Sequence, residues 1–175
     1  MNSSKLTITF FLLLMANLYM HSQSLQPFEL DARWKNKIKS MVDSHPTVKY
    51  KKQKRVLIFS LHTGYKHWTI PHTEAVMQII AEHNAVFEVT VSKDIAHFEK
   101  AQLSKYDVVV LNNNCSDRER RDMFWDVLKN DSSLTEIEKN QKAKKLEENL
   151  IRFVRKGNGL VILHGGIVMQ NNSMA

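Results

Sequence analysis

Residues 153–166, FVRKGNGLVILHGG, contain the end of a helix, a turn, a strand and the polar turn that follows the strand. Lys156 followed by Gly157 is a helix C-terminal signal, because glycine readily adopts the left-handed conformation that closes a helix. The run 160–163 is apolar without interruption, which is typical of a strand buried on both faces, as in a parallel sheet. The stretch therefore predicts a helix that leads directly into a parallel strand.

Three earlier stretches are also predicted to be strands, the first of them by an equally unbroken apolar run. They cover residues 56–59, 87–91 and 107–111. The spacing of apolar residues between them predicts helices over 71–84 and 95–103, the first with a proline in its opening turn. Strands that alternate with helices build a parallel sheet, so the sequence predicts an α/β protein with helices on both faces of one sheet.

Two further helices are predicted between the third and fourth strands, over 117–129 and 134–156. The longer one begins with a capping box, Thr135 with Glu138 three residues later. Its Glu and Lys residues are interpreted as its solvent-facing side. The residues expected to face the core are Ala75, Val76, Ile79 and Ile80 in the 71–84 helix, Met123, Phe124, Val127 and Leu128 in the next, and Leu146, Leu150, Phe153 and Val154 in the last.

The N-terminal residues 1–24 have the layout of a secretory signal peptide. Lys5 precedes an apolar stretch over 6–20, and small polar residues follow at Ser22 and Ser24. A membrane-spanning helix needs roughly 20 apolar residues, so a retained anchor is the less favoured alternative. We therefore expect cleavage near residues 22–24, export to the periplasm or the extracellular space, and membrane contact only during export.

Residues 25–53 are predicted to be an N-terminal helix, over 31–43, followed by a basic linker. The chain has a formal net charge of +7, and much of the excess lies in Lys49, Lys51, Lys52, Lys54 and Arg55. A basic cluster can bind nucleic acid. We favour a solvated linker and expect no nucleic-acid partner, because no aromatic ladder or nucleic-acid motif accompanies the cluster. With a single cysteine, the chain also lacks an internal disulfide.

Three polar stretches follow the predicted strands, at 62–67, 112–115 and 164–166. Ligands of open parallel sheets bind beyond the carboxyl ends of the strands, so these stretches are expected to meet in one cleft. His164 is the clearest candidate, since core packing does not explain a histidine that an apolar strand delivers into a Gly-Gly turn. It could act as a general base, bind a metal or donate to a sugar hydroxyl. The other histidines considered as metal ligands are His62, His67 and His72, and for each of them a hydrogen-bonding loop or surface role is favoured.

Other chemistry-bearing residues leave two interpretations open. Cys115 could be a nucleophile beside a histidine, but a buried or loop thiol is the favoured interpretation. Tyr65, Trp68 and Trp125 could stack on sugar rings or belong to the core. The glycines match neither of the phosphate-binding loop patterns, so nucleotide binding is not supported.

Four motifs taken together resemble the ThuA-like (trehalose utilization) family, of the class I glutamine amidotransferase-like, flavodoxin-like superfamily. They are RVLIFS at 55–60, TGYKH at 63–67, YDVVVLN at 106–112 and FVRKGNGLVILHG at 153–165. The resemblance covers 54–175 and implies a flavodoxin-like sheet and a small carbohydrate ligand, a disaccharide or keto-sugar. It implies His67 and His164 as acid/base residues or ligands of a divalent metal such as zinc. Residues implied to line the sugar site are Tyr65, Trp68, Asn112 and Gly165.

The chain also departs from the family pattern. Amidotransferase relatives carry a nucleophilic cysteine in the turn where this chain has His164-Gly165, so glutamine hydrolysis is not implied. The segment 115–146 is longer and more charged than usual, which suggests a surface elaboration. Family members continue well past the His-Gly position, so the domain is expected to be incomplete at its C-terminus. The alternatives are a non-catalytic carbohydrate-binding or accessory module and an inactive truncated fragment.

Overall fold

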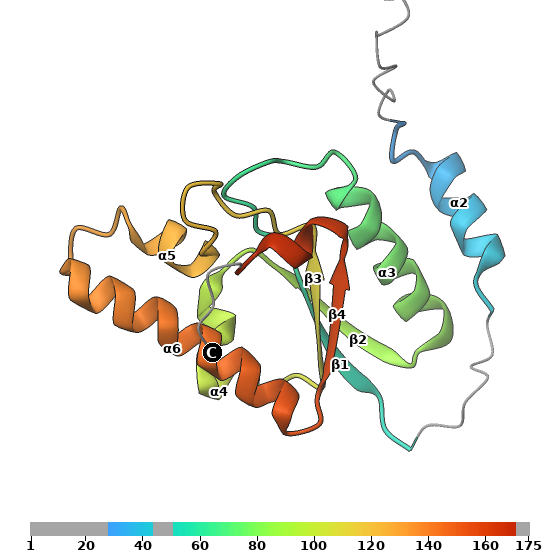
Figure 1. Cartoon of the computed structure of the whole chain (residues 1–175). Coiled ribbons are helices and arrows are strands. Elements are labelled where there is room, and N and C mark those ends of the chain that lie inside the picture. The colour runs from blue at the N-terminus through green and yellow to red at the C-terminus, as the bar shows by residue number, and fades with distance from the viewer. Residues whose placement is uncertain (1–27, 44–50, 171–175) are drawn as a thin grey trace, which may run out of the picture.

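The computed structural model describes residues 28–43 and 51–170. The predicted signal peptide and residues 44–50 of the basic linker lie outside these ranges. Four strands form one sheet in the order β2-β1-β3-β4, and every pairing is parallel (Figure 1). The strands are β1 (Lys54–Phe59), β2 (Phe87–Ser92), β3 (Val108–Asn112) and β4 (Gly159–Leu163). The α/β fold class and the four strands predicted from the sequence are confirmed, and the architecture is consistent with a flavodoxin-like fold.

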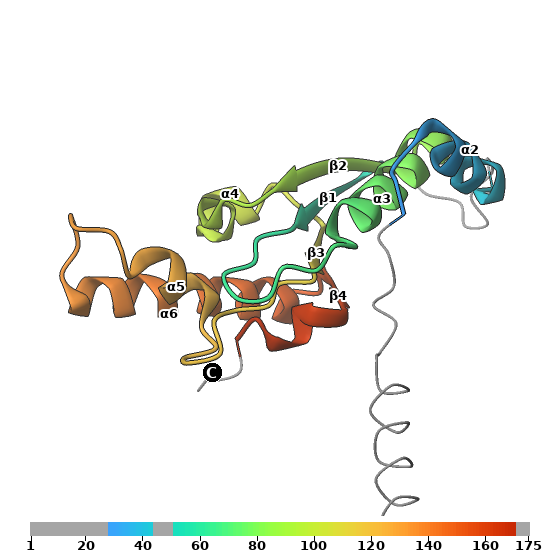
Figure 2. The ribbon, with the colours of Figure 1, turned by 90° about the horizontal axis from the view of Figure 1, so that it is seen from above.

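Helices cover both faces of this sheet, as predicted (Figure 2). One face carries α3 (Ile70–Asn84), and the other carries α4 (Lys100–Leu103), α5 (Met123–Leu128) and α6 (Glu136–Arg155). The helix predicted over 95–103 is split into a 3₁₀ turn, η1 (Ile95–Phe98), and α4. The described part of the chain contains no helix long and apolar enough to cross a membrane.

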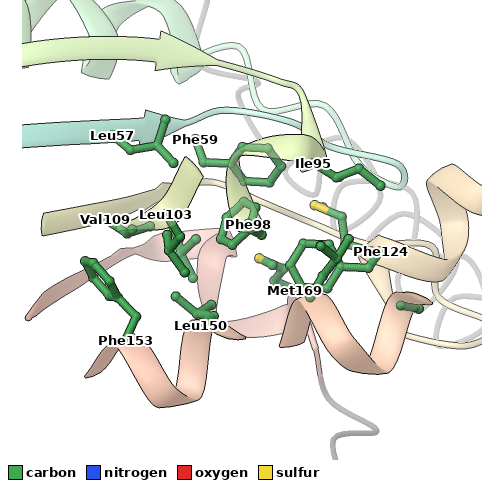
Figure 3. Packing of buried hydrophobic residues seen from close by; sticks show 14 of the residues in the cluster. Leu57, Phe59, Ile95, Phe98, Leu103, Val109, Phe124, Leu150, Phe153 and Met169 are labelled. Atoms are coloured by element: carbon green, nitrogen blue, oxygen red, sulfur yellow. The ribbon is translucent and has the colours of Figure 1, made fainter. Parts of the chain in front are cut away.

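The main hydrophobic core lies between the sheet and α6. Phe98 is fully buried at its centre, with its ring 4.8 Å from that of Phe59 and 5.0 Å from that of Phe124, both in edge contacts (Figure 3). Such aromatic pairs add to the free energy gained from apolar burial. A smaller cluster on the other face joins Val110 to its neighbours on β1 and to Met77 of α3. These clusters fix where the carboxyl ends of the strands lie.

Helix α6 confirms its predicted capping box and most of its predicted solvent-facing side, with Lys139 as the exception. The Thr135 and Glu138 side chains each bond the other residue's backbone N–H. Lys139, expected in solvent, is 8% exposed, and its Nζ donates to the carbonyl of Lys129 at 2.9 Å and to Glu136 Oε1 at 2.8 Å. Its ammonium group is accommodated because both partners replace the lost water. Val154, expected in the core, is exposed instead.

The helix predicted over 117–129 is the largest error in the secondary structure, since only Met123–Leu128 are helical. Asp122 caps the short helix through its side chain, and Arg121 before it has a positive φ of 54°, which a helix does not allow. The predicted core face is also wrong at Val127, which is exposed, while Asp126 is buried.

Strand β4 differs from the prediction in its burial. Val161 is 42% exposed and Ile162 is 48% exposed, on opposite faces of the sheet. Within the described residues β4 is an edge strand, paired with β3 alone. An unbroken apolar run therefore indicated the strand correctly but not its burial. The core-facing residues of α3 predicted from spacing are likewise only half-buried.

The helix predicted over 31–43 is confirmed as α2 (Ala32–Met41), which begins at the capping residue Asp31. It docks on the start of α3 through aromatic rings, with Trp34 5.5 Å from His72. His72 Nε2 also lies 2.8 Å from the carbonyl oxygen of Phe28. The N-terminal helix thus packs on the domain.

Candidate functional site

Three segments meet beyond the carboxyl ends of β1, β3 and β4, at the upper end of the sheet in Figure 1. They are the loop after β1, the loop after β3, and a 3₁₀ turn after β4, η2 (His164–Val168). The expected convergence of these polar stretches is therefore present. Within it, the ring centroids of His67 and His164 lie 4.7 Å apart, nearly perpendicular to each other.

His67 lies at the centre of this cluster. Its ring is 4.7 Å from the ring of Tyr65, and its Nε2 is 3.3 Å from the Sγ atom of Cys115. Burial lowers the pKa of His67, and the nearby imidazoles of His164 and His62 lower it further, because a second positive charge beside them is unfavourable. His67 is therefore neutral at pH 7.

The contact between Cys115 and His67 was not predicted from the sequence. Cys115 is 7% exposed, and burial raises the pKa of its thiol. The direction of the hydrogen bond between the thiol and the imidazole is set by the histidine tautomer, and the thiol also faces the carbonyl oxygen of Gly165 at 3.9 Å. The structure therefore fits the buried thiol favoured from the sequence, with the addition of a histidine partner.

The backbone around the histidine pair is unusual at two positions. His164 has a positive φ of 40°, a conformation that costs free energy for any residue except glycine. Gly165 follows it, and a Cβ atom there would lie 2.6 Å from Cys115 Sγ and 3.2 Å from His67 Nε2. The glycine is therefore required for the close approach of strand β4 to the Cys115–His67 pair.

Three asparagines at the end of β3 hold the loops together from inside. Asn112 has 0% exposure and donates to Ser60 Oγ at 3.0 Å and to the carbonyl of Ile70 at 3.1 Å. Asn114 donates to the carbonyls of Phe59 and Leu61. Asn112, implied as a sugar-lining residue, therefore lies inside the fold and supports the site from behind.

Trp68, also implied as a sugar-lining residue, lies away from the histidine pair. Its ring contacts Phe28 at 5.3 Å and His72 at 5.3 Å, within the aromatic cluster where α2 docks. His72, considered as a metal ligand, belongs to the same cluster. The structure thus brings together His67, His164, Tyr65 and Gly165, and it separates Trp68 and His72 from them.

A hollow of about 330 Å³ opens beside this cluster. Its lining residues are Tyr65, His67, Cys115, Ser116, Arg118, Arg121 and Val168. The two arginines were missed, because the stretch that contains them was interpreted as a helix on the surface. Another hollow, of about 260 Å³, lies at the opposite end of the strands against Tyr106 and Phe153, away from His67 and His164.

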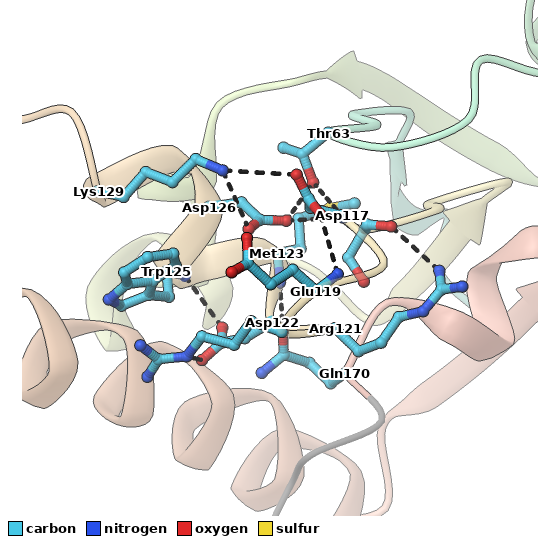
Figure 4. Close-up of polar contacts among 12 residues, drawn as sticks. Thr63, Asp117, Glu119, Arg121, Asp122, Met123, Trp125, Asp126, Lys129 and Gln170 are labelled. Carbon is cyan, nitrogen blue, oxygen red and sulfur yellow. Dashed lines mark hydrogen bonds and ion pairs between the residues drawn. The ribbon is translucent and has the colours of Figure 1, made fainter.

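A buried carboxylate fastens the loop after β1 to the segment that carries the arginines (Figure 4). Thr63 Oγ1 donates to Asp126 Oδ2 at 2.5 Å, and the backbone N–H of Asp117 donates to the same oxygen at 2.9 Å. Lys129 Nζ lies 3.7 Å from Asp126 and 3.6 Å from Asp117, so the two carboxylates share one positive charge. The charged segment after Cys115 is therefore part of the wall of the hollow.

The residues described so far do not assemble a metal site. Among residues 28–43 and 51–170, no group of three or more His, Cys, Asp and Glu side chains is placed to hold a metal ion together. The expectation of zinc at His67 and His164 stays a prediction. We assign no chemical step to a metal.

Acid is expected to destabilise the fold through His67 and His62. Both have a pKa below 6.5 in the folded chain, so the unfolded chain binds more protons as the pH falls through 6.5, and the free energy of unfolding falls with it. The carboxylates with lowered pKa values titrate below this window. Urea unfolding midpoints at pH 7.5 and 5.5 should differ less in His67→Gln than in wild type. His83→Gln, on the distant helix α3, is the control, and equal differences in all three proteins would contradict the assignment.

The fold and the site together define a class of protein. It is a parallel α/β protein with a histidine pair and a small hollow at the carboxyl edge of its sheet. Residues 55–174 match the family described as trehalose utilisation, ThuA, and the chain belongs to this family. Comparisons with curated proteins and with solved structures give no match.

Proposed function

We propose that this chain acts on a carbohydrate, a disaccharide or a keto-sugar, that binds in the hollow beside His67 and His164. Membership of the trehalose utilisation family supports a role in carbohydrate use. The observation that carries the proposal is the contact between two histidine rings, 4.7 Å apart, at the edge of a parallel sheet where ligands of such folds bind.

The two histidines have different proposed roles. His67 is neutral, and its Nε2 contacts Cys115 Sγ, so its proposed role is to exchange a hydrogen bond with a sugar oxygen through Nδ1. His164 is exposed and has no thiol partner, so it is the proposed general base that removes a proton from a hydroxyl group or from a carbon beside a carbonyl. Of the two histidines, His67 lines the hollow and His164 lies against His67.

A second function, carbohydrate binding without catalysis, is favoured by Tyr65. Tyr65 is 63% exposed next to His67, and an exposed aromatic side chain can stack on the apolar face of a sugar. In this alternative the histidines only donate and accept hydrogen bonds.

Sugar binding and turnover can be tested in one nuclear magnetic resonance experiment. The purified chain is incubated with trehalose and with a keto-sugar, with and without added zinc, and saturation transfer reports binding while new sugar signals report turnover. We expect both signals in wild type, and we expect Tyr65→Ala to lose most of the binding. His72→Ala, outside the hollow, is the control. Binding without turnover would favour the alternative, and no binding would overturn both functions.

Export is part of the proposal because of the signal-peptide layout of residues 1–24. The mass of the protein recovered from an exporting host would test it, since cleavage near residues 22–24 removes that segment. An uncleaved chain would contradict it.

A further inference from the structure

The hollow beside His67 has a positively charged wall. Arg118 is exposed on it and Arg121 is half-buried, and both come from the segment after Cys115 rather than from the strands. The backbone carbonyl of Ser116 accepts a hydrogen bond from Arg121 at 3.1 Å, which orients this guanidinium (Figure 4). The guanidinium group carries five N–H donors, so most of its donors remain for a ligand.

The charges of these arginines are balanced only in part by the residues around them. Among the residues that the structure describes, neither Arg118 nor Arg121 forms an ion pair. Asp117 shares Lys129 with Asp126, and Asp122 pairs with Arg120 at 3.7 Å. A hydrogen bond from the backbone N–H of Glu119 lowers the pKa of the Asp117 carboxyl, and the positive charges of Lys129 and Arg121 lower it further, so Asp117 balances part of the charge of Arg121. The positive charge of Arg121 is also felt at Cys115, where it opposes the effect of burial on the thiol pKa.

No negative charge is contributed to the hollow by the residues that line it. Its polar groups are the hydroxyls of Tyr65 and Ser116, the imidazole of His67, the thiol and the two guanidinium groups. Lys66 adds a further positive charge close to His62 on the same loop. A hollow with several cations and no lining carboxylate attracts anions, and guanidinium groups bind carboxylate and phosphate in a bidentate manner.

We propose that the natural ligand of this hollow is an anionic sugar, one that carries a carboxylate or a phosphate group. Arg118 and Arg121 hold the charged group, which places the ring of the sugar against Tyr65 and its hydroxyl groups beside His67. This inference rests on the proposed function and narrows it from carbohydrates in general to charged ones. It also assigns a role to the charged segment 117–121, which the sequence indicated only as a surface elaboration.

The test compares three sugars of the same ring: glucose, glucuronate and glucose 6-phosphate. Isothermal titration at low salt is expected to show a dissociation constant at least about tenfold lower for one of the charged sugars than for glucose. Raising the salt concentration should lower the affinity for the charged sugar and leave the affinity for glucose unchanged. Comparing the affinities for glucuronate and glucose 6-phosphate tells whether the group recognised is a carboxylate or a phosphate.

Variants locate the effect. Arg118→Gln, an exposed replacement that leaves the fold intact, should lower the affinity for the charged sugar by about tenfold. The double replacement Arg118→Gln with Arg121→Gln should lower it further. The double replacement Arg152→Gln with Arg155→Gln removes the same charge from α6 and should leave the affinity for the charged sugar unchanged. Equal affinity for glucose and both charged sugars, or unchanged affinity in Arg118→Gln, would overturn this inference and leave the proposed function standing. Binding of none of the sugars, together with no binding of trehalose or of the keto-sugar, would overturn both.

Discussion

Replacing His164 by glycine is expected to lower the rate of sugar turnover by about 10²–10⁴-fold, the usual contribution of a general base. The same replacement should raise the free energy of unfolding by about 1 kcal/mol, because glycine accepts the positive φ that strains His164. The imidazole is exposed, so little packing is lost with it. A variant that is more stable and less active would identify His164 as a residue kept for chemistry. Activity is measured by turnover and stability by urea unfolding.

Ala85 provides the matched control for this experiment. It has a positive φ of 53° at the C-terminus of α3, far from the hollow. Ala85→Gly should therefore give a similar gain in stability with no change in turnover. If His164→Gly kept full activity, or if it lost stability while Ala85→Gly gained it, a structural role for His164 would replace the proposed one.

Replacing Gly64 by alanine is expected to cost about 3 kcal/mol of stability, at the upper end of the range for overpacking. A Cβ atom at this position would collide with the backbone carbonyl of Ser116, and neither backbone can yield easily. The N–H groups of Thr63 and Gly64 both donate to the carbonyl of Cys115, so the collision breaks the attachment of one loop to the other. Urea unfolding measures the loss, and the affinity for sugar should fall with it because His67 lies on this loop.

Gly165→Ala is the contrasting replacement, since its collision is with a side chain. The new Cβ would meet Cys115 Sγ, so Cys115→Ala in the same chain should restore most of the lost stability. No second side-chain replacement should rescue Gly64→Ala. Equal rescue at both positions, or no loss in Gly64→Ala, would show that the two loops are not held as closely as the structure has them.

The predicted fold follows from patterns that are local in the chain. Each strand is an apolar run that a turn signal ends, and α6 begins at a capping box. These signals depend on residues a few positions apart, so they could be recognised without knowledge of the fold. The helix predicted over 117–129 was wrong because apolar spacing does not reveal competing local structure. The Asp117 side chain closes a turn with the N–H of Glu119, Arg121 has a positive φ, and Asp122 caps a helix that begins only after it.

The candidate site was predicted in outline only. Topology alone brought the loops after β1, β3 and β4 together, since parallel strands end at one edge. The direction of each side chain depends on packing between segments about 50 residues apart. That packing turned Asn112 inward, placed Trp68 against the N-terminal helix and brought Cys115 into contact with His67.

The sequence by itself determined the strands, their order along the chain, the polar turn at His164 and the family to which the chain belongs, because these are written in short contiguous motifs. Only the tertiary structure decided that Lys139 is buried, that Val161 is exposed, and that Arg118 and Arg121 form one wall of the hollow with His67. The physical reason is that burial and electrostatic environment belong to the space around a residue. Distant parts of the chain fill that space, and their positions are set by the packing of the whole fold.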